Sequence, residues 1–454
     1  MQALGRHFSF LDKEFVNKIL AIALPVAATN LINFSVKAVD TLMLGRVGEV
    51  QLSASALANQ MSLMFMIFST GVGAGCGVLA SQYWGAGDKE RVRDIFAFMY
   101  RFMICLNLVF ASVAFFAPDI VLGIMTTDPE VIAYGVMYLR ILSAAYLVSG
   151  LTNASVVLLR SVGVVKIPLV VYSSSLVISA SLGFVLIFGH LGFPELGIRG
   201  AAIGTTVARF VEVIIISVYI LKVDKTLGFR VRNLFGRISH VSRGFIRYGM
   251  PVVLNEALWA AAFFVLNIII GRMGREFVAA NAIGGLIMQF NGMFVFSVAS
   301  AMAVIIGNTI GEGRYERAQQ IAVGMLPVSF LIGLVCALIV RIIRVPFVNF
   351  YNLSDTAHTY ALQITNITSV LIIFVSVALI SLMGTLRGGG DGKFVMIVDV
   401  VFMLLIAIPL GAYTGLVLGW PVWIVFIILR SEDVFKTIAV IWRVTRGKWL
   451  KDVR

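Results

Sequence analysis

The sequence contains twelve apolar stretches, each long enough to cross a lipid bilayer as a helix, for which about 20 mainly apolar residues suffice. The stretches lie near 15–43, 54–83, 95–117, 130–158, 165–189, 197–221, 244–271, 278–308, 319–341, 357–385, 394–418 and 420–443. They are continuous apolar runs, whereas the strands of a membrane barrel alternate apolar and polar residues. Because backbone groups in lipid must be hydrogen-bonded within the chain, the runs predict an all-α polytopic membrane protein with twelve transmembrane helices.

The composition excludes a soluble enzyme, a disordered chain and a disulfide scaffold. Hydrophobic residues make up 59% of the 454 residues and charged residues only 13%, against about 25% charge in a soluble domain. The three cysteines, Cys76, Cys105 and Cys336, all lie inside apolar stretches and have no metal-ligand spacing, so we interpret them as packing residues. No cofactor and no enzymatic activity are expected.

The basic residues predict the orientation of the chain. Lys and Arg total 36 against 23 acidic residues, a net charge of +13. Most of them fall in the loops and termini on one side of the predicted spans, notably in 222–243 and in the C-terminal tail. The positive-inside rule places that side in the cytoplasm, which predicts a cytoplasmic-membrane protein with both termini inside. The charge is therefore interpreted as a topology signal and not as a nucleic-acid surface.

Two halves of the sequence match at a nearly constant offset of 226 residues. The matched pairs are Leu24-Pro25 with Met250-Pro251, Gly45-Arg46-x-Gly48 with Gly271-Arg272-x-Gly274, and Gly85-x-Gly87 with Gly311-x-Gly313. The match predicts an N-lobe of six helices (1–221), a cytoplasmic basic linker (222–243) and a C-lobe of six helices (244–454). An even number of helices in each half predicts a pseudo-twofold axis along the membrane normal.

Two related six-helix lobes favour a transporter that works by alternating access, in which the lobes rock around a central cavity. Channels are more often oligomeric rings, and membrane enzymes usually show clustered His or Asp motifs, and neither pattern is present. The chain is therefore expected to act as a monomer. Pro25 and Pro251 occupy equivalent places in the first and seventh stretches, where a proline kinks a helix, and are predicted hinges.

Acidic residues inside the spans are the candidate coupling sites, since each costs roughly 2.5–3.5 kcal/mol at the centre of a membrane helix. Asp40 lies in the first stretch with Lys37 three residues before it. It is either half of an internal ion pair with Lys37 or a site for a cation or proton. Asn30, on the same stretch, is taken as a further polar candidate.

Glu256 is the strongest single candidate. It lies well inside the seventh stretch and has no basic residue within one helical turn, so it should either have a raised pKa or bind a cation. Asn255 and Trp259 lie beside it, and the face of a tryptophan next to a carboxylate suits an organic cation. Trp259 taken alone is equally compatible with an aromatic at the membrane interface.

Two more acids lie around the eleventh stretch. Asp391, in a glycine-rich segment that follows Arg387, is a candidate ion site, with a solvated cytoplasmic turn as the alternative. Asp399 lies within the stretch itself. Glu212, in contrast, has Arg209 three residues before it and is predicted to form a local structural ion pair.

Several segments together resemble the multidrug and toxic compound extrusion (MATE) transporters. The segments are IALPVAATNLINFSVKAVDTLMLGRVG, VLASQYWGAGDKERVR, FGHLGFPELGIRGAAIGT, VIIGNTIGEGRYERA, TLRGGGDGK and RVTRGKWLKDV. The resemblance covers nearly the whole chain. It implies a twelve-helix, two-lobe exporter that exchanges Na⁺ or H⁺ for bulky, mostly cationic organic compounds without ATP.

The resemblance also assigns roles to residues. Asp40 falls on the family's acid of the first helix, and Asp391 on the acid that follows an Arg-Gly pair near the tenth. Glu256 lies one helical turn before the place of a glutamate in the sodium-linked branch, so Glu256 and Asp391 are predicted Na⁺ ligands. A second branch uses an aspartate where this chain has Gly183. A proton site that pairs Asp40 with such an aspartate is therefore less expected.

The main alternative is a lipid-linked oligosaccharide flippase of the same superfamily. Such proteins tend to carry basic residues in the cavity to hold phosphate. Lys37 is the one lysine interpreted as lying deep in a predicted helix, and acids outnumber it. The sequence therefore favours the efflux antiporter, with small organic cations and the lipid bilayer as its partners and no nucleic acid.

Overall fold

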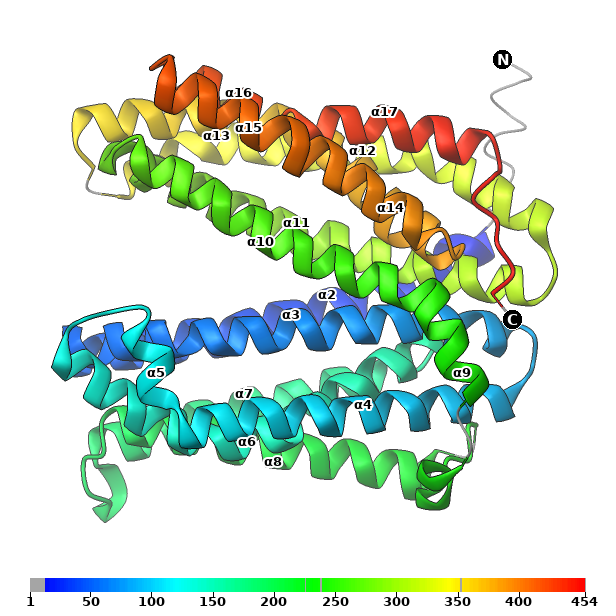
Figure 1. Ribbon diagram of the computed structural model, residues 1–454, viewed down its shortest axis with the longest axis horizontal. Coiled ribbons are helices and arrows are strands. Elements are labelled where there is room, and N and C mark those ends of the chain that lie inside the picture. Colours follow the sequence, from blue (N-terminus) through cyan, green and yellow to red (C-terminus); the bar gives the residue numbers. More distant parts are fainter. Residues whose placement is uncertain (1–12, 225, 237–238, 352, 454) are drawn as a thin grey trace. The chain divides into compact units, whose positions relative to one another are not determined.

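Helices make up the secondary structure of the described residues, among which no strand occurs. The computed structural model describes residues 13–224, 226–236, 239–351 and 353–453. The α-helices of the first half are α2 (Lys13–Val47), α3 (Glu49–Gly85), α4 (Lys89–Phe116), α5 (Pro118–Gly123), α6 (Pro129–Ser161), α7 (Lys166–Phe188) and α8 (Ile198–Val218) (Figure 1). Those of the second half are α9 (Ser239–Gly244), α10 (Met250–Arg272), α11 (Arg275–Gly311), α12 (Tyr315–Asn349), α13 (Asp355–Leu379), α14 (Gly392–Asp399), α15 (Ile408–Ala412), α16 (Val422–Arg430) and α17 (Glu432–Thr445).

Shorter 3₁₀ and π-helical segments extend or join these helices. They are η1 (His190–Gly192), η2 (Tyr219–Val223), η3 (Val231–Phe235), η4 (Phe245–Gly249), η5 (Ile380–Leu386), η6 (Val400–Ala407) and η7 (Tyr413–Val417). The π segments η5 and η6 matter for the candidate site, because a π turn holds an extra residue and changes where the following side chains point. Arg387 directly follows η5, and Asp399 directly precedes η6.

Within the described residues, ten helical segments are long and apolar enough to cross a membrane. They correspond to ten of the twelve predicted stretches. The sixth stretch folds as α8, which carries Arg199, Arg209 and Glu212. The twelfth is divided at Ser431 between α16 and α17. The chain is thus an all-α polytopic membrane protein, as the apolar runs predict.

The chain divides into two compact units. Unit 1 contains the described residues up to Leu24, then Ser81–Gly87 and Gly244–Arg454, and unit 2 contains Pro25–Ala80 and Asp88–Arg243. Helices α2 and α3 each contribute to both units. The units therefore differ at these two helices from the predicted lobe limits of 1–221 and 244–454, which stay a prediction.

In unit 2, α6 packs against both α4 and α8, and α8 packs against α7 (Figure 1). Helix α3 approaches α6 through glycines. A Cβ atom at Gly73 would lie 3.1 Å from Val157 Cγ2, and one at Gly77 would lie 3.4 Å from Ser161 Oγ. The glycine run of α3 is thus a close-packing face, as small residues usually are between membrane helices.

In unit 1, α11 and α12 pack against α13, while α14 packs against α10 and α17 packs against α13. Buried apolar residues that include Leu266, Phe277, Ile364 and Phe426 form the core. These contacts bring α10, α14 and α17 together, three helices that carry charged side chains discussed below.

The last turns of α3 cross α11 within unit 1, and the contact repeats the internal duplication. A Cβ atom at Gly85 would collide with the backbone of Asn308, and one at Gly311 would collide with the backbone of Gln82. Gly85 and Gly311 are equivalent under the 226-residue offset, and so are Gln82 and Asn308. The matched glycines are therefore required because two equivalent helix ends approach each other's backbone.

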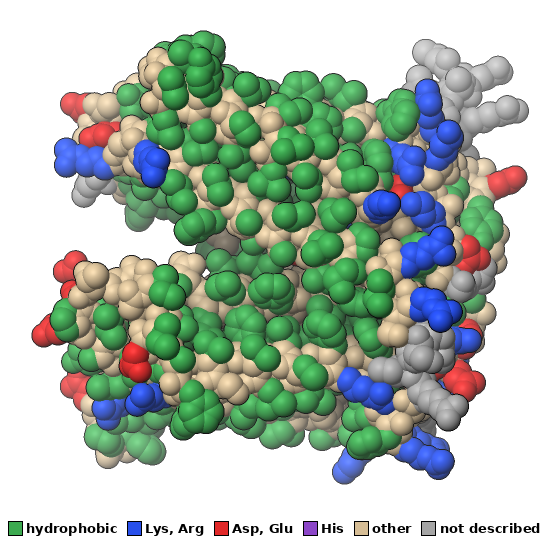
Figure 2. Space-filling model, viewed as in Figure 1, with side chains coloured by type: hydrophobic (Ala, Val, Ile, Leu, Met, Phe, Trp, Pro, Cys, Tyr) green, Lys and Arg blue, Asp and Glu red, His purple; other side chains and the backbone are tan. Residues whose placement is uncertain are grey.

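The outer surface of the helices is apolar. Figure 2 shows hydrophobic side chains over the middle of the long helices, and most of the Lys and Arg side chains of this view near α9 and the C-terminal tail. Phe116 and Ile342 are 78% and 75% exposed. Large exposed apolar residues of this kind are suited to lipid and not to water.

The α3–α11 contact predicts that Gly85→Ala and Gly311→Ala lower stability by similar amounts. Each added Cβ must displace a backbone, for which about 1–3 kcal/mol is typical of overpacking. The measurement is the Tm of the purified protein in detergent. Gly292→Ala on α11, where a Cβ meets no atom within 4 Å, is the matched control and should leave the Tm unchanged or slightly raised. A Tm unchanged in both test variants would contradict the packing described here.

Candidate functional site

Asp40 lies on α2 in unit 2, and its carboxylate accepts a hydrogen bond from a hydroxyl group. Thr205 Oγ1 of α8 donates to Asp40 Oδ2 at 3.4 Å, and the buried Ser179 hydroxyl of α7 lies near the carboxylate. Lys37, the partner in one of the two alternatives that the sequence left open, is exposed. The structure thus gives Asp40 a hydroxyl donor from a neighbouring helix.

The predicted local pair on α8 is confirmed. Arg209 Nη1 lies 2.6 Å from Glu212 Oε1, and the Glu212 side chain is buried. The guanidinium of Arg209 also acts electrostatically on Asp40. Arg209 is thus in direct contact with Glu212, while the Asp40 carboxylate has the Thr205 hydroxyl as its hydrogen-bond donor.

Glu256 on α10 in unit 1 is not the unpaired acid that the sequence suggested. Arg387 Nη1, directly after η5, lies 2.7 Å from Glu256 Oε1. The two residues are 131 positions apart in the chain. The sequence criterion considered only basic residues within one helical turn, and it missed a partner supplied by tertiary packing. Arg387 itself is 5% exposed, so the pair is largely buried.

Asn255 and Asp399, both predicted site residues, are brought together by the packing of α10 on α14. Asn255 Nδ2 donates a hydrogen bond to Asp399 Oδ2 at 2.9 Å. The other oxygen, Asp399 Oδ1, lies 2.7 Å from Lys436 Nζ on α17. Lys436 also lies 2.7 Å from Glu432 Oε2, one turn earlier on the same helix. Lys436 is 5% exposed, so the interpretation of Lys37 as the one deep lysine is wrong.

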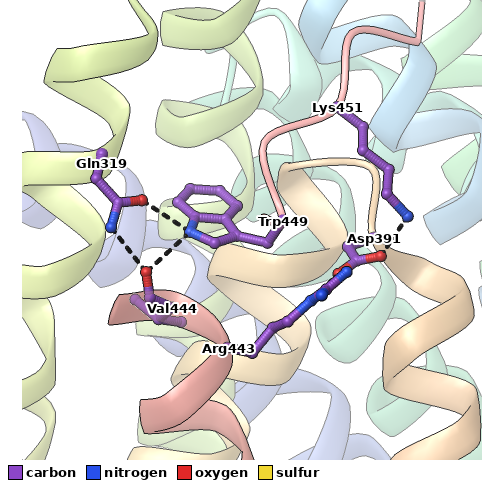
Figure 3. A network of polar contacts seen from close by, with 6 residues as sticks. All are labelled: Gln319, Asp391, Arg443, Val444, Trp449 and Lys451. Carbon is purple, nitrogen blue, oxygen red and sulfur yellow. Dashed lines mark hydrogen bonds and ion pairs between the residues drawn. The ribbon is translucent and has the colours of Figure 1, made fainter. Parts of the chain in front are cut away.

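Asp391 is buried, with 1% of its surface exposed, so the alternative of a solvated cytoplasmic turn is wrong. Arg443 Nε of α17 lies 2.8 Å from Asp391 Oδ2. Lys451 of the C-terminal tail forms an ion pair with the other carboxylate oxygen (Figure 3). A carboxylate so deep in the protein requires counter-charge, and here two cations provide it.

The C-terminal tail is itself anchored by buried contacts. Trp449 is fully buried, and its indole N–H donates to Gln319 Oε1 at 2.9 Å and to the Val444 carbonyl at 3.2 Å (Figure 3). A Cβ atom at Gly389 would collide with the indole ring. The glycines that precede Asp391 therefore leave room for the tail to reach that carboxylate.

Gln82, in the last turns of α3, joins the same network. Its side-chain amide donates to the carbonyls of Gly388 and Lys451, each at 3.2 Å. Gln82 Oε1 accepts a hydrogen bond from the Val453 backbone N–H at 3.1 Å. The tail is thus fixed on both sides of Lys451, which keeps the ammonium group beside Asp391.

The remaining predicted residues lie in less specific settings. Trp259 is 44% exposed and stacks on Phe263, with ring centroids 5.7 Å apart, and Asn30 is half-buried on α2. Pro25 lies inside α2, where the division between the two units falls. Pro251 lies in the first turn of α10, directly after the π segment η4. The hinge role of both prolines stays a prediction.

Sequence reasoning missed Lys436, Glu432 and the tail residue Lys451 as members of the site. The missed signal was the spacing of Glu432 and Lys436, which are four residues apart on one helix. The described residues hold no group of three or more His, Cys, Asp or Glu side chains placed to bind a metal ion. Na⁺ binding at Glu256 and Asp391 stays a prediction, and both carboxylates are already paired with cations.

Comparison with known proteins gives a consistent result. The sequence matches the family model described as MatE over residues 25–185 and 251–413. These two ranges begin at Pro25 and Pro251, the equivalent prolines of the duplication. The family model thus matches once in each half of the chain.

Curated relatives and solved structures agree with this match. The chain is 26% identical over 312 residues to a probable multidrug resistance protein NorM of Streptococcus pneumoniae, covering 68% of each chain. It is 24% identical over 443 residues to a protein of the same description from Bacillus cereus, covering 94% of this chain and 96% of the relative. A crystal structure described as MATE in the bent conformation superposes with a TM-score of 0.86 at 17% identity, covering 97% and 98% of the two chains.

The pairing of Asp391 predicts that Asp391→Asn strongly destabilises the protein. The change leaves Arg443 and Lys451 without their counter-charge, and breaking a buried pair costs about 3–5 kcal/mol. The Tm of the purified variant in detergent should fall well below that of Asp119→Asn, the matched control at an exposed position on α5.

A double-mutant cycle with Arg443→Gln separates this pairing from other effects. Asp391→Asn leaves Arg443 without a counter-charge, and Arg443→Gln removes that cation. The decrease in Tm of the double variant should therefore be smaller than the sum of the decreases of the two single variants. Strict additivity would contradict a direct interaction between the two side chains.

Proposed function

The chain belongs to the multidrug and toxic compound extrusion (MATE) family, and from that premise we propose that it is an ion-driven exporter of bulky, mostly cationic organic compounds. Proteins of this family are transporters and not enzymes. The curated relatives named above are described as multidrug resistance proteins. Our proposal extends that description to this chain and adds exchange against Na⁺ or H⁺ by alternating access.

The observation that carries the proposal is the environment of Asp40. Its carboxylate lies in a membrane helix and accepts a hydrogen bond from the hydroxyl of Thr205, with the buried Ser179 hydroxyl nearby. Of the four predicted acids, Glu256, Asp391 and Asp399 are instead ion-paired with Arg or Lys. A carboxylate held by neutral donors keeps its charge available for a proton, a metal ion or an organic cation.

The coupling ion and the cationic substrate compete for the Asp40 carboxylate, and this competition couples their transport. Uptake of the coupling ion at Asp40 weakens the binding of a cationic substrate, and the substrate weakens the binding of the ion by the same factor. Alternating access then carries the two in opposite directions. No cofactor is required, because the ion gradient supplies the energy.

The proposed setting is the cytoplasmic membrane, with both termini in the cytoplasm. The support is the excess of Lys and Arg in the loops and termini on one side of the spans. We propose that a single chain is the working unit, since two homologous halves in one chain supply what other transporters obtain from two subunits.

The flippase alternative is disfavoured by the partners of the buried basic residues. A pocket for phosphate requires cations that are not already neutralised. Arg209, Arg387 and Lys436 are paired with Glu212, Glu256 and the acids Asp399 and Glu432. These pairs leave a cation-binding carboxylate at Asp40 as the better-supported recognition group.

The proposal predicts that Asp40→Asn abolishes ion-driven transport. The measurement is uptake of a fluorescent organic cation by proteoliposomes under separate Na⁺ and pH gradients. The parent should respond to at least one gradient. Asp40→Asn should lose that response by about 10-fold or more, the size of a typical coupling between two sites.

Asp119→Asn is the control, because it removes the same charge from an exposed position outside the spans. It should transport like the parent. Parent-like transport by Asp40→Asn would contradict the assignment of the site. Flux that ignores both gradients would remove the antiport proposal.

A further inference from the structure

The Lys436 ammonium group lies between two carboxylates, in the place that a metal cation bound by both would take. Its Nζ atom lies 2.7 Å from Asp399 Oδ1 and 2.7 Å from Glu432 Oε2. Asp399 is 9% and Glu432 3% exposed. Two buried carboxylates, one on α14 and one on α17, therefore converge on one ammonium group within unit 1.

A buried amide lies next to one of the two carboxylates. Asn255 is 1% exposed and donates through Nδ2 to Asp399 Oδ2. Its own oxygen, Oδ1, is buried and has no hydrogen-bond partner among the described residues. Carboxylate and amide oxygens are hard ligands, the type that binds Na⁺ within transporters. Asn255 thus adds an unpaired amide oxygen next to Asp399.

The charged groups around the cluster of Asp399, Glu432 and Lys436 are themselves balanced or paired. Asp433 of α17 and Arg430 of α16 lie within electrostatic range of it and oppose each other in sign. Glu256, which follows Asn255 on α10, is already paired with Arg387. The cluster proper therefore consists of Asp399 and Glu432 against a single positive group.

We propose that the Lys436 ammonium occupies a monovalent-cation site formed by Asp399 and Glu432, with the unpaired amide oxygen of Asn255, next to Asp399, as a further ligand for a metal ion. This inference rests on the proposed cation coupling and deepens it. Lys436 is four residues from Glu432 on the same helix, so its charge is tethered and cannot diffuse away. A sodium ion could bind here only if the ammonium group lost its two carboxylate partners, which would leave a buried charge unpaired. Unit 1 therefore binds no Na⁺ at this site, and exchange of the coupling ion falls to Asp40.

The test is to remove the tethered charge and ask whether sodium replaces it. Lys436→Met keeps a long apolar stem and frees the oxygens. The purified full chain in detergent is assayed for retained radioactive Na⁺ and for its Tm in NaCl against choline chloride. The parent sets the baseline for both readouts, because a coupling Na⁺ at Asp40 contributes to them equally in every variant. Lys436→Met should bind about one Na⁺ per chain more than the parent, matching the single lost charge, with an additional rise of the Tm in Na⁺ that saturates.

Matched variants identify the site. Lys436→Met with Asp399→Asn should lose the acquired sodium dependence. Lys451→Met, which removes the lysine paired with Asp391, should acquire none. Lys436→Arg should bind no more Na⁺ than the parent, because it restores a tethered cation.

A second variant covers the case in which Lys436→Met does not fold. Lys436→Met with Glu432→Gln removes one positive and one negative charge and so preserves the net charge of the cluster. It should still bind Na⁺ through Asp399, Asn255 and the new amide. Recovery of folded Lys436→Met by NaCl but not by choline chloride would also support the proposal.

Two results overturn it. One is a folded variant without the Lys436 ammonium that acquires no Na⁺. The other is Na⁺ binding by the parent that Asp399→Asn abolishes. Efflux of an organic cation by the parent is measured in parallel. A parent that shows no ion-driven efflux contradicts the proposed function, whereas the sodium readout at Lys436 is independent of that result.

Discussion

A carboxylate within a membrane must have a partner, and this requirement organises the polar interior of unit 1. Each of the three predicted acids there meets a cation from a distant part of the chain: Glu256 meets Arg387, Asp399 meets Lys436, and Asp391 meets Arg443 and Lys451. Breaking any such pair strands a buried charge. The pairs therefore tie α10, α14, α17 and the tail to one another.

The C-terminal tail shows how a short segment can satisfy this requirement. Trp449 fills a space next to Gly389, and Gln82 bonds the backbone of Lys451 and Val453. With its backbone fixed on both sides, Lys451 is held beside Asp391. The glycine-rich segment, the end of α3 and the tail are thus parts of one polar network, although they lie far apart in the sequence.

The two halves share their backbone features more closely than their charges. The equivalent glycines Gly85 and Gly311 make equivalent contacts, because close backbone approach tolerates only glycine. Asp40 of the first half accepts a hydrogen bond from a hydroxyl group, whereas Glu256 and Asp399 of the second half are ion-paired. Under the proposed function, this asymmetry places ion exchange in unit 2 and leaves unit 1 with tethered counter-charges.

The sequence by itself determined the membrane class, the helical fold, the internal duplication and the family. These properties follow from local composition and from a fixed offset, which need no knowledge of distant contacts. It also predicted the Arg209–Glu212 pair, because both residues lie on one helix face. Only the tertiary structure decided the partners of Glu256, Asp391 and Asp399, since those cations come from positions 52 to 131 residues away or from another helix. Helical periodicity reports which residues share a face, but the packing of separate helices selects which charge meets which.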